Sequence, residues 1–208
     1  MSVKSDLSQV NVIFFDLFNV LIGIDQSVVI HKISKQLGLP FGETKEIVTG
    51  KYFVRYQRGE IDYKQYFQNI QYELKNGESL DYTEFLQNWR SSKLGEFPTV
   101  SVIPILKKKY RIYLLSNTTN NHIKSLAKQF PFLNSFDGLI TSESANALKP
   151  DPDIFTYAMN VANTTPSHSL FIDDQFANVQ SAKNLGMHIH HYTDFENFSN
   201  FIKHLVKL

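Results

Sequence analysis

Short apolar runs recur along the chain, and their spacing predicts buried strands that alternate with helices. The first run, Asn11 to Phe15, is rich in Val, Ile and Phe, which is typical of a parallel strand covered on both faces. Similar runs follow at Arg111 to Leu115, Gly138 to Thr141, Ser169 to Ile172 and Met187 to Tyr192. This alternation predicts an α/β fold with a doubly wound parallel sheet.

Two of the intervening helices have recognisable ends. Asp151 is followed by a proline, which predicts an N-cap and a first helical position. The stretch from Gln175 to Leu185 repeats apolar side chains at helical spacing, with Phe176 and Val179 on the same expected face, and Gly186 stops it. Both segments are therefore predicted to be helices between strands.

The segment 25–97 has a different pattern. It shows no strand-like run, and its aromatic residues recur at helical spacing: Tyr52, Phe53, Tyr56, Tyr63, Tyr66 and Phe67. We expect a small all-helical module inserted after the first strand, which leaves 1–24 and 98–208 as the α/β unit. Gly59 and Asn76-Gly77 are the expected breaks between its helices. We interpret the aromatic residues as packing between these helices rather than as a substrate pocket.

Composition and charge exclude several classes of partner. The chain is 42% hydrophobic and 20% charged, with a formal net charge of +1 and no basic run longer than Lys107 to Lys109. We therefore expect no nucleic-acid and no membrane partner. The absence of cysteine excludes disulfides, thiolate metal sites and a cysteine nucleophile. The polar first ten residues and the lack of a long apolar segment favour a cytoplasmic protein, and no feature indicates the oligomeric state.

Residues with reactive side chains stand where the first and second long strands end. Asp16 closes the first apolar run, and Ser116-Asn117 follows the run that starts at Arg111. A carboxylate in such surroundings must be hydrogen-bonded, paired or bound to a cation, so a turn or cap role is the plain alternative. For Ser116-Asn117 the plain alternative is N-capping of the next helix.

Two further strand ends carry charge. Lys149 follows the strand around Leu139, and taken on its own it favours an exposed lysine in a loop over a site residue. Asp173-Asp174 follows the run that starts at Ser169; two adjacent carboxylates repel each other unless a cation or a basic group lies between them.

The four strand ends together indicate one site, because ligands bind in open α/β sheets at the carboxyl ends of the strands. Oxygen ligands from Asp16 and Asp174 suit Mg²⁺, with Lys149 and Ser116 facing the same point. A cation, hydrogen-bond donors and a carboxylate nucleophile are what phosphoryl transfer requires. The sequence thus predicts a Mg²⁺ cofactor and a small phosphate ester as substrate.

These motifs, in this order, resemble the haloacid dehalogenase-like superfamily of hydrolases. The resemblance rests on Asp16, Ser116, Lys149 and Asp173-Asp174, and on a helical cap inserted after the first motif. The chain is also similar to the bacterial branch that dephosphorylates α-D-glucose 1-phosphate, in Phe15-Asp16-Leu17, Asn19-Val20, Ile24-Asp25 and Arg58-Gly59-Glu60-Ile61. The resemblance implies a Mg²⁺-dependent phosphatase for a small phosphate monoester, with sugar phosphates as candidates.

By this resemblance each site residue has an expected role. Asp16 is the nucleophile and forms an aspartyl-phosphate, while Ser116, Asn117 and Lys149 hold the phosphate. The metal ligands are then Asp16, the main-chain carbonyl of Phe18 and Asp174. Asp173 contacts the metal through a water molecule or supports one of the direct ligands.

Phe18 departs from the family pattern, in which a second Asp at this position is the general acid and base. Such catalysis contributes about 10²–10⁴-fold, and a phenyl ring cannot transfer protons. The similar sugar-phosphatase branch also lacks this Asp. One hypothesis is that an anomeric oxygen leaves easily enough to need less protonation.

Three other functions fit part of the pattern. Haloacid dehalogenases of the superfamily carry an aromatic residue at the position of Phe18, but they need no metal and use a cap arginine for which Arg55, Arg58 and Arg90 have no matching context. A non-catalytic phosphate-binding or regulatory protein on the same fold would also tolerate Phe18. A receiver domain has its acidic pair at the first strand, which disfavours that class.

The histidines near the last strand favour a polar edge strand over a metal site. His188 and His190 share one strand face, but no third ligand follows at fitting spacing.

Overall fold

The computed structural model describes residues 7–206 and divides into two compact units. We call Met1–Ile22 with Glu96–Leu208 the α/β unit, and Gly23–Gly95 the helical unit. Within the described range, no helix combines the length and the apolar character needed to cross a membrane.

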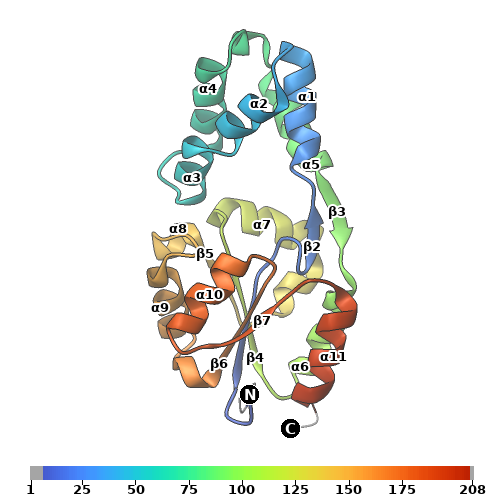
Figure 1. Cartoon of the computed structure of the whole chain (residues 1–208), viewed down its shortest axis with the longest axis vertical. Helices are drawn as coiled ribbons and strands as arrows, with labels where there is room; N and C mark the ends of the chain where they lie inside the picture. Colours follow the sequence, from blue (N-terminus) through green and yellow to red (C-terminus); the bar gives the residue numbers. More distant parts are fainter. Residues whose placement is uncertain (1–6, 207–208) are drawn as a thin grey trace. The chain divides into compact units, whose positions relative to one another are not determined.

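A five-stranded parallel sheet forms the centre of the α/β unit, in the order β5-β4-β1-β6-β7 (Figure 1). Its strands are β1 (Val12–Phe15), β4 (Arg111–Ser116), β5 (Gly138–Thr141), β6 (Ser169–Asp173) and β7 (His188–His191). Each of the predicted strands is therefore confirmed within two residues. The topology also confirms the predicted doubly wound α/β fold.

The apolar run in β1 explains how the sheet is covered. Ile13 and Phe15 belong to the core on one face, and Val12 and Phe14 to the core on the other, because successive side chains of a strand point to opposite faces. All four side chains are fully buried. An apolar run that is not interrupted by alternating polar residues thus indicates a strand with a hydrophobic core on each side.

Helices on both faces supply those cores. Residues of α6, α7 and α11 pack with Phe15, and residues of α9 and α10 pack with Phe14. The helices of this unit are α6 (Ile103–Leu106), α7 (Asn120–Gln129), α8 (Ser142–Ala145), α9 (Pro152–Val161), α10 (Phe176–Asn184) and α11 (Phe195–Val206), with 3-10 turns at Pro98–Val102, Pro131–Ser135 and Pro166–His168.

The ends of α9 and α10 follow the sequence signals, but one buried face does not. Asp151 caps α9 by accepting a hydrogen bond from Asp153 N–H at 3.0 Å, as predicted. In α10 the expected apolar face is wrong at Phe176, which is 66% exposed, while Asn178 is buried. The helix is rotated so that the amide of Asn178 reaches a buried carboxylate at the site described below.

The helical unit builds its own core from aromatic residues. Its helices are α1 (Ser27–Leu37), α2 (Phe41–Val48), α3 (Lys51–Gln57), α4 (Tyr63–Glu73) and α5 (Tyr82–Ser91), with a 3-10 turn at Gly77–Ser79. Tyr66 is fully buried, and its ring lies 5.5–5.8 Å from those of Tyr56, Tyr63 and Phe85. The predicted aromatic residues thus pack against one another, and helices end before Gly59 and Asn76, as expected.

A two-stranded ribbon that the sequence did not indicate connects the units: β2 (Ile22–Ile24) pairs with β3 (Lys93–Glu96). With three residues in β2, the pattern is too short to distinguish a strand from the turn before it.

Candidate active site

The switch point of the sheet brings the predicted site residues together. From β1 the chain first adds β4 and β5 on one side and then β6 and β7 on the other. Asp16 directly follows β1, Ser116 is the last residue of β4, and Asp173 is the last residue of β6. These residues therefore share the crevice at the carboxyl ends of adjacent strands, which is where open α/β sheets bind ligands.

Lys149 joins two of these strand ends. Its Nζ lies 2.6 Å from Asp16 Oδ1 and 2.7 Å from Asp173 Oδ2, and the residue is only 5% exposed. Burial by itself would lower the pKa of Lys149, but the two carboxylates outweigh it and the pKa is raised. The ammonium is therefore a fixed positive charge at the centre of the crevice.

The oxygens of Asp173 are fully engaged by the protein. Oδ2 accepts from Lys149 Nζ and from Asn178 Nδ2 at 3.0 Å, and Oδ1 accepts from Gln175 N–H at 2.7 Å and from Asn178 Nδ2 at 3.0 Å. Asp173 is completely buried. These contacts fix Lys149 in place and leave Asp173 the least available carboxylate of the site.

The three carboxylates of Asp16, Asp173 and Asp174 offer oxygens that lie within 4.8 Å of one another. Burial raises the pKa of Asp16 to about 7; Lys149 opposes the rise, and the charges of Asp173 and Asp174 add to it. Burial also raises the pKa of Asp174. One ammonium cannot balance three ionised carboxylates, so this oxygen-only group fits a hard divalent cation such as Mg²⁺.

A tight turn after β1 places Phe18 and Asn19 beside this group. Asn19 adopts φ 59°, a left-handed conformation that Asn tolerates better than most residues, and its N–H donates to Ile22 O at 2.7 Å. Phe18 forms an isolated bridge with Ile22. Asn19 Nδ2 lies 3.5 Å from Asp174 Oδ2, so the turn returns to the edge of the carboxylate group.

Ser116 presents a buried hydroxyl with no hydrogen-bond partner among the described residues. The residue is 1% exposed. An unsatisfied buried hydroxyl costs about 1–3 kcal/mol, which a ligand oxygen would recover. The hydroxyl therefore favours a ligand at this strand end over the plain role of a cap; the N-cap of α7 is instead Thr119, whose Oγ1 accepts from His122 N–H.

The side chain of Asn117 is turned toward Lys149. Its Oδ1 accepts from Lys149 N–H at 2.8 Å, and its Nδ2 donates to Lys149 O at 2.9 Å. The sequence suggested a phosphate contact for Asn117. In the structure, the oxygen and the nitrogen of its side-chain amide both form hydrogen bonds with the main chain of Lys149.

Sequence reasoning missed three residues that support the site. Asn178 and Gln175 hold Asp173, and His191 Nε2 donates to the main-chain carbonyl of Asp174 at 2.9 Å. The available signal for Asn178 was its spacing. An amide four residues after an acidic pair is about one helical turn away, so it can reach back to the carboxylates at the start of the helix.

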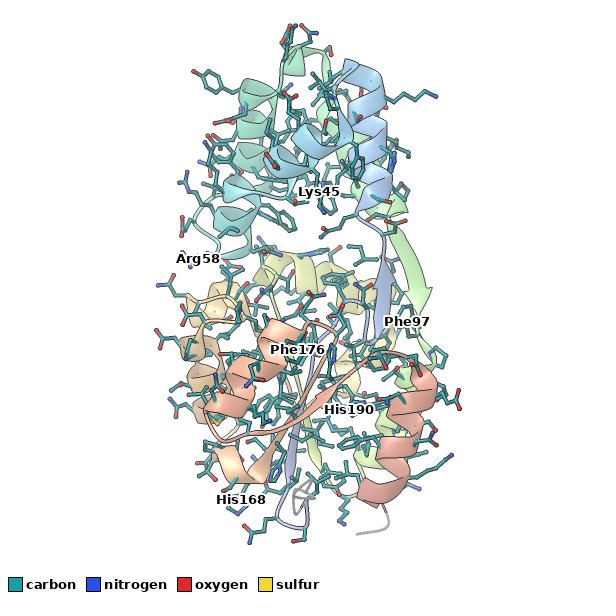
Figure 2. The ribbon with its side chains drawn as sticks, viewed as in Figure 1. Lys45, Arg58, Phe97, His168, Phe176 and His190 are labelled. Carbon is teal, nitrogen blue, oxygen red and sulfur yellow. The ribbon has the colours of Figure 1, made fainter. Side chains whose placement is uncertain are left out.

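A cleft of about 660 Å³ opens beside Asp174 within the α/β unit. Phe97, labelled in Figure 2, is part of its wall. The other lining residues are Asn19, Pro98, Asp174, His191, Tyr192, Thr193, Asp194 and Phe195. The outer side of the carboxylate group is therefore accessible to small molecules.

Among known families, the chain matches the haloacid dehalogenase-like hydrolases over residues 10–186. It is 30% identical over 191 residues to a D-ribitol-5-phosphate phosphatase of Bacteroides thetaiotaomicron, which is 84% of this chain and 87% of that protein.

Two solved structures resemble the chain as a whole. A haloacid dehalogenase family enzyme of B. thetaiotaomicron, crystallised with magnesium and inorganic phosphate, is 25% identical with a TM-score of 0.79, covering 92% of this chain and 98% of that one. A predicted hydrolase of the same family from Porphyromonas gingivalis is 27% identical with a TM-score of 0.81, covering 97% and 100%.

Proposed function

The chain belongs to the haloacid dehalogenase-like hydrolases, and on this footing we propose that it is a Mg²⁺-dependent phosphatase of small phosphate monoesters. The observation that carries the proposal is the convergence on one crevice of Asp16, the buried Lys149, the unpaired hydroxyl of Ser116 and the group of three carboxylates.

Asp16 is the proposed nucleophile. One of its carboxylate oxygens attacks phosphorus, the bond from phosphorus to the leaving oxygen breaks, and an aspartyl-phosphate forms. Water then attacks phosphorus, which releases inorganic phosphate and restores the carboxylate. The attack requires the ionised form, so the burial that raises the pKa of Asp16 must be offset when substrate is bound.

Ser116, Lys149 and Asn117 form the proposed phosphate site. Ser116 Oγ would donate to a phosphate oxygen, and Lys149 would supply positive charge to oxygens whose charge grows in the transition state. The role of Asn117 is to hold the main chain of Lys149. Such donors are effective because they are in place before the reaction starts.

Mg²⁺, when bound, would neutralise phosphate oxygens and reduce their repulsion from Asp16. We assign its ligands to Asp16, Asp174 and the carbonyl of Phe18. Asp173 fits an indirect role, since its oxygens already accept four hydrogen bonds, including that from Lys149.

The substrate class we propose is a phosphorylated sugar or sugar alcohol. A relative with 30% identity is named for ribitol 5-phosphate, a small polyol phosphate. The helical unit would act as the cap that selects among such substrates, while the phosphate is bound by the α/β unit alone.

The test is phosphate release from a panel of monoesters with Mg²⁺, for the wild type and Asp16→Asn. Turnover that requires both Mg²⁺ and Asp16 is the expected result. Asp153→Asn is the matched control, because it makes the same change at an exposed position of the α/β unit. An inert panel, or Asp16→Asn with wild-type turnover, would favour the non-catalytic binding protein.

Phe18 supports a second candidate, hydrolysis of 2-haloacids. In that reaction the Asp16 carboxylate would displace halide from carbon, and no metal is needed. The group of three carboxylates argues against it, because unbalanced negative charge hinders binding of an anionic haloacid. Halide release from 2-haloacids in the presence of EDTA would establish this activity.

A further inference from the structure

His122 lies beside the residue that replaces the usual proton donor. Its ring stacks on that of Phe18, with 6.0 Å between ring centroids and 24° between ring planes. Phe18 comes two residues after Asp16, in the turn that follows β1. The region where the missing carboxylic acid would stand is thus bordered by an imidazole.

The position of His122 is fixed by the strand that carries Ser116. Thr118 follows β4, and its Oγ1 lies 2.9 Å from His122 Nδ1. The N–H of His122 donates to the N-cap Thr119 at 3.2 Å. The ring therefore stands at the first turn of α7, directly after the strand end that presents the Ser116 hydroxyl.

Contacts distinguish His122 from the histidines of the last strand. His122 is half-buried, and Thr118 is buried. His190 packs on Phe201, and the Nε2 atoms of His188 and His191 lie at main-chain carbonyls. His122 alone among these contacts the turn that carries Phe18.

We propose that His122 is the proton donor for the leaving group, in place of the family's second Asp; this rests on the phosphatase function proposed above. As the bond from phosphorus to the leaving oxygen breaks, its electron pair stays on that oxygen, which takes a proton from the imidazolium. The neutral ring then takes a proton from the water that attacks the aspartyl-phosphate, so His122 returns to its starting form. With Nδ1 at Thr118, Nε2 is the atom that would carry this proton.

Dependence on the leaving group tests this role, because a poor leaving oxygen needs protonation and a good one does not. We expect His122→Gln to lower kcat/KM for an alkyl phosphate by about 10²-fold or more, and for p-nitrophenyl phosphate by less than about 10-fold. The ratio kcat/KM covers formation of the aspartyl-phosphate, so hydrolysis of that species does not mask the effect. His168→Gln, at a half-buried position in the turn before β6, is the control and should change the kinetics of neither substrate.

Restoring the family's residue provides the second arm. Phe18→Asp in the His122→Gln background should recover at least about 10-fold in kcat/KM for the alkyl phosphate, since the new carboxylic acid donates instead. If His122→Gln does not fold, His122→Ala with added imidazole gives the same comparison.

The outcomes separate the two proposals. Equal losses on both substrates would make His122 a structural residue, and unchanged kinetics would exclude it. In either case a turnover that depends on Asp16 would leave the phosphatase proposal intact, whereas its absence would remove both.

Discussion

The side-chain amide of Asn117 brackets the main chain of Lys149, accepting from its N–H at 2.8 Å and donating to its carbonyl at 2.9 Å. Asn117 follows the last residue of β4, and Lys149 comes after β5 and α8. The pair therefore ties the lysine loop to the strand end that presents Ser116. This contact therefore fixes Lys149 and Ser116, the two donors of the proposed phosphate site, relative to each other.

Asn117→Ala tests whether this bracket matters for catalysis. The change removes both hydrogen bonds and releases the loop, and a displacement near 1 Å can cost about 10²-fold in rate. We expect a fall of that size in kcat/KM for a phosphate monoester, measured by phosphate release. Asn121→Ala, exposed on α7, should behave as the wild type. Wild-type kinetics for Asn117→Ala would mean that Lys149 is positioned by other contacts.

Lys149→Met tests the electrostatic balance of the site without substrate. It leaves the carboxylates of Asp16 and Asp173 buried with no cation, and breaking a buried ion pair in this way costs about 3–5 kcal/mol. Urea unfolding in EDTA at pH 8 should show this loss in the free energy of unfolding. Lys149→Met with Asp173→Asn should be less destabilised than Lys149→Met alone. A double variant that is less stable than Lys149→Met alone would contradict the account.

Mg²⁺ should stabilise the protein through the carboxylate group. A ligand at a hundred times its Kd contributes about 2.7 kcal/mol, and each kcal/mol shifts the Tm of a chain this size by about 2–4 °C. We expect the Tm with Mg²⁺ to be about 5–10 °C higher than the Tm with EDTA, and we expect Asp174→Asn to lose most of this difference. Asp153→Asn should keep it. An equal shift in all three proteins would place the cation elsewhere.

The stability of the α/β unit should fall in acid because of His190. Its ring, on β7 beside α11 in Figure 2, is 8% exposed and stacks on Phe201 at 4.2 Å between ring centroids. Burial, and then the charge of His191, lower the pKa of His190 from 6.5 to about 4. Between these values the unfolded chain binds more protons, so stability is complete above pH 6.5 and is lost as the pH falls toward 4.

The expected contribution of His190 is at most about 3.5 kcal/mol over that range, at about 1.4 kcal/mol for each pH unit. His190→Phe should flatten this part of the pH profile of the free energy of unfolding. His168→Phe, which alters a half-buried histidine in the turn before β6, is the control and should leave the slope unchanged. A profile that His190→Phe does not alter would show that other groups cause the acid sensitivity.

The central strands β1, β4 and β6 were predictable because their apolar runs indicate burial on both faces of a sheet. The buried face of α10 was not, since apolar spacing pointed to Phe176 while the polar Asn178 is turned inward to Asp173. A hydrogen bond to a buried carboxylate leaves no mark in a hydrophobic pattern. The helical unit was visible through its aromatic spacing, and the short ribbon β2–β3 was not.

The candidate site shows a similar division. Residue types at the ends of strands pointed to Asp16, Ser116, Lys149 and the acidic pair, and the structure brings these together. Their pairing was not readable: a lone lysine in a loop gives no sign that it will lie between Asp16 and Asp173. His122 left no signal at all, because one histidine in the first turn of a helix has no pattern of its own. Its relation to Phe18 exists only in the fold.

The central claim is a covalent phosphate on Asp16. The most direct measurement is mass spectrometry of peptides from enzyme mixed with substrate and Mg²⁺ and quenched in acid during turnover. We predict a phosphate on the peptide that contains Asp16, lost in Asp16→Asn and discharged when the quench is delayed until substrate is exhausted. Steady phosphate release from an enzyme whose Asp16 is never phosphorylated would contradict the account.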